Sequence, residues 1–133
     1  MESPIVLYID HRPQVLKLRK ATLEGHGYYV KLASSGYTAI KTLEETSVAA
    51  VLLEYKQEGM DAEGIACHIK QRFPNLPIIL LSACSDMPQR ILWLVDDYVM
   101  KGEMPERLIS TLKRARRLGP RSDEGHSRRQ TAV

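Results

Sequence analysis

The sequence predicts an α/β fold in which a parallel five-stranded sheet carries helices on both faces. Three observations support this prediction. Short apolar runs typical of buried strands alternate along the chain with stretches that have the apolar spacing of helices. Several runs are apolar at consecutive positions, as in parallel strands covered on both sides. The chain of 133 residues is 44% hydrophobic, which is enough apolar material for the core of one domain.

The predicted strands are short, rich in β-branched or aromatic residues, and bounded by Gly, Pro, Ser or charged residues. They cover residues 5–9, 28–32, 49–53, 77–81 and 98–100. The first, third and fourth are the runs that are apolar throughout, so we expect helices over both of their faces.

Helical spacing fills the segments between these strands, and capping residues mark several helix ends. The expected helices begin at Pro13, at a Ser35 cap, before Ile65, near Ser85 and at Pro105. Gly25–Gly27 ends the first helix and Pro74 follows the third. Residues 121–133 have no apolar periodicity, so we expect a folded domain over residues 1–118 and a basic, disordered tail over 119–133.

Five strand–helix units joined by right-handed crossovers favour the doubly wound, flavodoxin-like strand order 2-1-3-4-5. In such sheets the site lies outside the carboxyl ends of the strands, near the point where the strand order reverses. The residues at those ends are therefore the candidates for function.

Composition excludes several classes of protein. No apolar stretch is long enough to span a membrane, and no secretory signal is visible at the N-terminus. Cys67 and Cys84 lack metal-binding or redox spacing, so we expect free thiols in a cytoplasmic protein. The net charge of +3 arises at the C-terminal end, because residues 113–133 hold seven basic and two acidic side chains.

Polar side chains stand at four of the five predicted strand ends. They are Asp10 and His11 after the first strand, Glu54 after the third, Ser82 after the fourth and Lys101 after the fifth. A single polar residue at a strand end usually means only that the loop meets water. Five such groups converging on one crevice indicate a site.

With these residues in place, the chain resembles the receiver domains of response regulators, which accept a phosphoryl group in two-component signalling. The resemblance covers residues 4 to about 117. The segments that carry it are Ile5–Asp10, Val51–Glu54, Met60–Asp61, Ile78–Ala83 and Asp97–Lys101.

The resemblance implies a role for each strand-end residue. In the family an aspartate takes the phosphoryl group, acidic residues hold a divalent metal, and a lysine and a hydroxyl contact the phosphoryl oxygens. Lys101 matches the lysine, Ser82 the hydroxyl and Asp10 the first acidic residue. Tyr98 matches an aromatic that moves inward when the family's hydroxyl shifts.

Two departures affect the chemistry of the site. Glu54 stands at the phosphoacceptor position, with its carboxylate one methylene, roughly 1.5 Å, farther out. His11 replaces the second acidic residue, so an Mg²⁺ site built from Asp10 and Glu54 should be weak or absent. We therefore expect a pseudo-receiver in which Glu54 pairs with Lys101 and Ser82, imitates a phosphoryl group and holds an active-like state. The segment between Ser82 and Tyr98 is also about three residues short for the family, which predicts a short fourth helix.

The expected function is that of a non-enzymatic signalling module. By resemblance, its partner is a histidine kinase, a phosphotransfer or output protein, or a second copy of the chain, bound through the fourth helix, fifth strand and fifth helix. Trp93 contributes either to such a surface or to the core.

Two alternatives stay open: phosphorylation of another acceptor, Asp61 or His11, and a nucleic-acid-associated adaptor acting through the basic tail. The tail lacks aromatic residues and the length of a helix-turn-helix, which makes nucleic acid the weaker reading.

Overall fold

The computed structural model describes residues 3–55, 61–83 and 86–118. Strands and helices alternate along the chain, as the apolar pattern predicts. The elements are β1 (Ile5–Ile9), α1 (Pro13–Glu24), β2 (Tyr29–Ala33), α2 (Gly36–Glu45), β3 (Ala50–Glu54), α3 (Ala62–Arg72), β4 (Ile78–Ser82), α4 (Gln89–Leu94), β5 (Asp97–Met100), the 3₁₀ turn η1 (Lys101–Glu103) and α5 (Glu106–Leu118).

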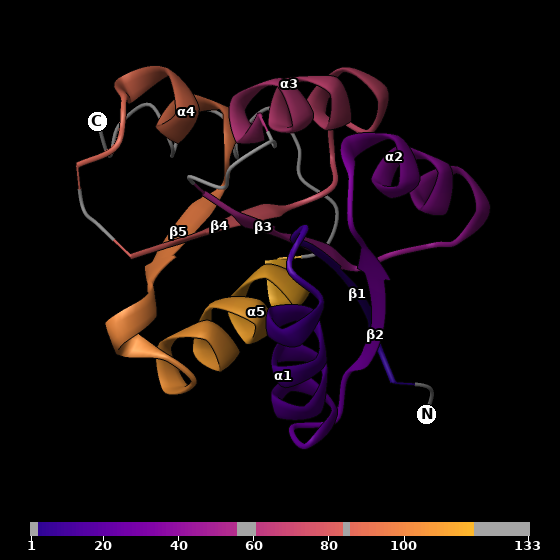
Figure 1. Ribbon diagram of the computed structural model, residues 1–133, viewed down its shortest axis with the longest axis vertical. Coiled ribbons are helices and arrows are strands. Elements are labelled where there is room, and N and C mark those ends of the chain that lie inside the picture. The colour runs from indigo at the N-terminus through magenta and orange to yellow at the C-terminus, as the bar shows by residue number, and fades with distance from the viewer. Residues whose placement is uncertain (1–2, 56–60, 84–85, 119–133) are drawn as a thin grey trace.

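All paired strands run parallel in the order β2-β1-β3-β4-β5, which confirms the predicted fold and strand order. Figure 1 shows α1 and α5 together on one face of the sheet and α2, α3 and α4 on the other. Each crossover helix therefore packs against the sheet, and the three central strands have helices over both of their faces.

Two apolar clusters form the core, one on each face of the sheet. Alternate residues of β1 divide between them. Leu7 and Ile9 belong to the cluster under α2, α3 and α4, whereas Val6 and Tyr8 belong to the one under α1 and α5. Because strand side chains alternate, Asp10 continues the Tyr8 side of the sheet. Glu54 likewise continues the side of Leu52, which is the register partner of Tyr8.

Capping explains several helix boundaries. Ser35 and Thr38 form a reciprocal capping box at the start of α2, as the sequence predicts for Ser35. Pro13 is the first residue of α1. After α1 the chain turns at Gly27, whose φ of 91° is a left-handed conformation that suits glycine.

The structure corrects several predicted boundaries. The fourth helix begins at Gln89 rather than near Ser85, and Pro88 precedes it, so the helix is short as the spacing indicates. Residues 84–85, where the predicted helix begins, lie outside the described part of the chain. Strands β2, β3 and β4 each end one residue later than predicted, which places Glu54 and Ser82 inside their strands.

A partly buried ion pair anchors β5 after this short helix. The Lys70 Nζ lies 2.6 Å from an Asp96 oxygen and donates to the Leu76 carbonyl at 3.0 Å. The same Asp96 oxygen accepts from the Ile78 backbone at 2.8 Å. The starts of β4 and β5 are thus joined through α3.

Candidate functional site

The carboxyl ends of the strands bring the predicted polar residues to one edge of the sheet. Asp10 follows β1, while Glu54 and Ser82 close the adjacent strands β3 and β4, and all three are buried to 1% exposure or less. The Tyr55 amide donates to the Leu81 carbonyl at 2.8 Å, which holds the ends of β3 and β4 together. Lys101 follows β5 and reaches this edge from the outer side.

Glu54 forms an ion pair with Lys101. Its Oε2 contacts the Lys101 Nζ, and its Oε1 accepts a hydrogen bond from the Tyr8 hydroxyl at 2.9 Å. The lysine is 28% exposed, whereas the glutamate is enclosed. Both oxygens of the carboxylate therefore contact side chains of the protein itself.

Tyr8 links the two buried carboxylates. Its hydroxyl lies 3.0 Å from Asp10 Oδ2 as well as 2.9 Å from Glu54 Oε1. A phenol has one proton, so the hydroxyl donates to one carboxylate at a time. Burial, and next the nearby charge of Glu54, raise the pKa of Tyr8 above its usual value, so the phenol stays protonated.

Arg12 clamps Asp10 from the solvent side. The guanidinium Nε and Nη2 donate to the two oxygens of Asp10 at 3.1 and 2.9 Å, and the Arg12 amide adds a third hydrogen bond at 3.0 Å. Burial alone would raise the pKa of Asp10. The hydrogen bonds from Arg12 and Tyr8 outweigh burial and hold that pKa below its ordinary value.

The guanidinium also approaches the second carboxylate. Arg12 Nη2 lies 3.7 Å from Glu54 Oε2. The hydrogen bonds from Arg12 to Asp10 raise the pKa of Arg12 above its ordinary value. Two carboxylates and two cationic side chains thus share the pocket, and their formal charges balance.

Two predicted residues do not join this network in the same way. His11 Nδ1 lies 3.9 Å from Asp10 Oδ1, beyond hydrogen-bond distance, and the imidazole is partly exposed. Tyr98 is 40% exposed, so it does not take the inward position that the resemblance links with an active-like state.

Sequence reasoning missed Tyr8 and Arg12. Tyr8 stands two residues before Asp10 in a buried strand, and a buried phenol needs a hydrogen-bond partner. Arg12 stands two residues after Asp10, directly before the proline that opens α1. The spacing of two residues on either side of the buried aspartate is the signal that could have found both.

The donor set does not fit a Mg²⁺ ion. Mg²⁺ requires oxygen ligands in a near-octahedral arrangement. Here Arg12 occupies the Asp10 oxygens, and Lys101 contacts Glu54. Within the described ranges, no group of three or more His, Cys, Asp or Glu could hold a metal ion.

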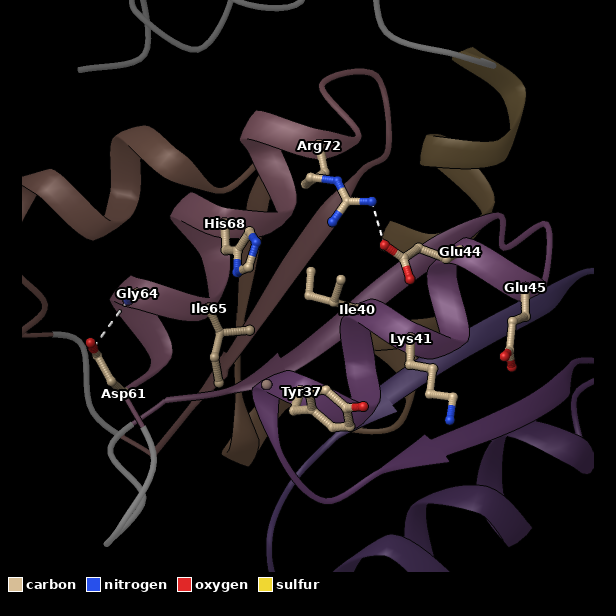
Figure 2. Close-up of a pocket in the computed structure, with 11 residues that line it drawn as sticks. Tyr37, Ile40, Lys41, Glu44, Glu45, Asp61, Gly64, Ile65, His68 and Arg72 are labelled. Carbon is tan, nitrogen blue, oxygen red and sulfur yellow. Dashed lines mark hydrogen bonds and ion pairs between the residues drawn. The ribbon is translucent and has the colours of Figure 1, made fainter.

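A separate cleft lies between α2 and α3, with a volume of about 710 Å³. Figure 2 shows Tyr37, Lys41 and His68 around an apolar floor of Ile40 and Ile65. Its lining includes none of the strand-end residues described above.

Comparison with known families decides what this fold and pocket belong to. The family model of the response regulator receiver domain matches residues 6–113. The chain belongs to the receiver domain family. This confirms the resemblance drawn from the strand-end residues.

Curated relatives of this receiver domain are longer proteins. An NtrX-like response regulator of Rickettsia bellii is 31% identical over 115 residues, which cover 83% of this chain and 24% of that protein. The DNA-binding response regulator MtrA of Mycolicibacterium smegmatis is 28% identical over 111 residues, covering 81% of this chain and 48% of MtrA. The receiver domain therefore spans about a quarter to a half of these relatives.

Solved structures share the same fold. The response regulator TrrA of Thermotoga maritima, crystallised with Mg²⁺ and BeF, superposes with a TM-score of 0.77 at 26% identity and covers 84% of this chain and 98% of TrrA. TrrA has also been solved in complex with the histidine kinase ThkA. Among the described residues, no helix is long and apolar enough to cross a membrane.

Proposed function

We propose that this receiver domain signals by protein contact, as a pseudo-receiver that is not phosphorylated at residue 54. The observation that carries the proposal is the double engagement of Glu54, whose two oxygens contact Lys101 and Tyr8. An attacking carboxylate needs an oxygen in line with the phosphodonor, and a misplacement of ~1 Å can cost ~100-fold in rate. A glutamate already held by a lysine and a phenol is poorly placed for that attack.

The Glu54–Lys101 pair stands where a phosphoryl group would contact the lysine. A carboxylate imitates that group only in part, because it carries one charge and two oxygens. Tyr98 is exposed, so we propose that the pair holds one constitutive state of the pocket rather than the full active state. The partner then recognises the domain without a phosphorylation cycle.

The proposed docking surface is formed by α4, β5 and α5. β5 is the edge strand, and α4 and α5 flank it on opposite faces of the sheet (Figure 1). Trp93 and Tyr98 are 54% and 40% exposed there. This exposure favours a role for Trp93 in a binding surface over a role in the core. The complex of TrrA with ThkA supports a signalling protein as the partner, with a phosphotransfer or output protein or a second copy as further candidates. We place this module in the cytoplasm, with residues 119–133 as a tail outside the domain.

An intact-mass experiment tests the proposal. The full chain is incubated with acetyl phosphate and Mg²⁺, with an Asp-bearing receiver as the positive control. We expect no phosphoryl adduct on this chain while the control is modified. An adduct that disappears in Glu54→Gln would refute the pseudo-receiver reading.

The same experiment addresses the alternative acceptors. Asp61 caps α3, where its Oδ1 accepts from the Gly64 amide at 3.1 Å, and this contact opposes a role as nucleophile. An adduct lost in Asp61→Ala or His11→Ala would instead establish a phosphorylatable receiver with another acceptor. The rival adaptor function would require the tail, which lies outside the described residues.

A further inference from the structure

Arg12 lies where a positive charge is needed between the two buried carboxylates. Its guanidinium forms two parallel hydrogen bonds to Asp10, and the same Nη2 is 3.7 Å from Glu54 Oε2. Such bidentate pairs with a carboxylate are the strongest and most directional that arginine makes. Asp10 is wholly buried, so its charge depends on this partner.

The backbone around Arg12 holds the guanidinium in place. Arg12 has φ of −97° and ψ of 113°, the extended conformation that a following proline favours, and Pro13 then begins α1. The Arg12 amide also donates to Asp10 Oδ1 at 3.0 Å. The side chain therefore starts from a fixed point directly beside the carboxylate it binds.

We propose that Arg12 is a built-in replacement for the divalent cation and keeps such ions out of the pocket. Asp10 and Glu54 carry two negative charges, and Arg12 and Lys101 already balance them. An entering ion would have to displace the guanidinium from both Asp10 oxygens, and it would meet two positive charges at short range. The inference rests on the proposed function, since a pocket that needs no phosphoryl chemistry needs no metal to support it.

This inference differs from the expectation based on His11. A histidine in place of a carboxylate weakens an Mg²⁺ site by removing one hard ligand. An arginine on the remaining carboxylate blocks the site directly. The two explanations separate when Arg12 alone is changed, because His11 then stays in place.

The test measures metal binding with Mn²⁺ and Mg²⁺ alone, with no phosphodonor present. Mn²⁺ binding is followed by calorimetry, and the melting temperature is recorded with and without Mg²⁺ for the wild type and for Arg12→Ala. We expect the wild type to bind Mn²⁺ only weakly, and its melting temperature to be unchanged by Mg²⁺. We expect Arg12→Ala to bind Mn²⁺ about tenfold more tightly or better, equivalent to about 1.4 kcal/mol, and to melt higher in Mg²⁺.

Matched controls locate the effect. Arg90→Ala removes another arginine that pairs with a carboxylate, Glu63 at 2.6 Å, and should gain no metal binding. Adding Asp10→Asn to Arg12→Ala should abolish the gain. Arg12→Gln, which keeps much of the side-chain length, provides a second variant if Arg12→Ala fails to fold, as judged by circular dichroism.

Three results would overturn the inference. They are tight Mn²⁺ binding by the wild type, no gain in either Arg12 variant, and a gain that survives Asp10→Asn. None of them reports phosphoryl transfer, whereas the proposed function fails on a phosphoryl adduct detected by mass. The two failures are therefore distinguishable.

Discussion

Removing Lys101 should cost more stability than removing the charge of Glu54, although the two side chains form one ion pair. Lys101→Met leaves the Glu54 carboxylate buried at 1% exposure without its nearest cation. Breaking one side of a buried pair typically costs 3–5 kcal/mol. Arg12 lies 3.7 Å away and compensates in part, so we expect a loss of about 2–4 kcal/mol.

Glu54→Gln leaves a different residue without its partner. The glutamine oxygen can still accept from Tyr8, and Lys101, which is 28% exposed, can turn to water. We expect a loss of about 1–2 kcal/mol, close to that of a hydrogen bond involving a charged group. The double variant should lose less than the sum of the two single losses by about 1 kcal/mol or more, because both remove one shared interaction.

Urea unfolding followed by circular dichroism measures these free energies. Lys113→Met on the exposed face of α5 is the control, and its effect should stay within about 0.5 kcal/mol. Equal losses in Lys101→Met and Glu54→Gln, or strictly additive losses in the double variant, would show that the buried carboxylate does not depend on the lysine for its stabilisation.

Three further changes test the rest of the pocket and its surface. Tyr8→Phe removes the shared hydroxyl donor, and we expect it to lower the free energy of unfolding by about 1–3 kcal/mol in the same urea assay, with no loss contradicting the link between carboxylates. The pKa of Asp10 in the folded protein lies below its usual value of 3.8, so its contribution to stability is complete above that pH and is lost as the pH falls through the folded pKa. The free energy of unfolding, measured from pH 6 to pH 2, should therefore fall less steeply in Asp10→Asn than in the wild type, and an unchanged slope would refute this. Trp93→Ala should leave stability within about 0.5 kcal/mol but weaken capture of a partner kinase or output protein, and unchanged binding would move the docking surface elsewhere.

The fold was predictable because its signals are local and repeated. Strand runs such as residues 5–9 are apolar without interruption, and Ser35 caps its helix through a side chain only three residues from its partner. The parallel direction and the order of the strands then follow from the right-handedness of strand–helix–strand crossovers rather than from any single residue. The start of α4 was misplaced because proline is tolerated in the first turn of a helix, so Pro88 did not exclude a start near Ser85, whereas the helix begins only after Pro88.

The pocket was predictable only where a residue type matched a strand end. The carboxyl ends of parallel strands lie at one edge of the sheet, which allowed four residues to be grouped: Asp10, Glu54, Ser82 and Lys101. Tyr8 could not, since a tyrosine within a buried strand resembles an ordinary core residue. Its role depends on the pairing of β1 with β3, which sets its hydroxyl between two carboxylates 44 residues apart in the chain.

The unusual residues of this pocket make physical sense as a set. A longer carboxylate at position 54 reaches Lys101 and Tyr8, and it lies in an enclosed site. Asp10 is a second buried carboxylate. Without nearby cations, burying two carboxylates would destabilise the fold by far more than a hydrogen bond stabilises it. Arg12 and Lys101 supply two cations from the chain itself. If these residues compensate one another in this way, restoring Asp at position 54 alone should not restore phosphorylation, because Arg12 would still hold Asp10. The double variant Glu54→Asp with Arg12→Ala is then the smallest change that we expect to allow phosphorylation. Acetyl phosphate labelling of the two single variants and the double variant decides whether the arginine or the glutamate is the stronger block.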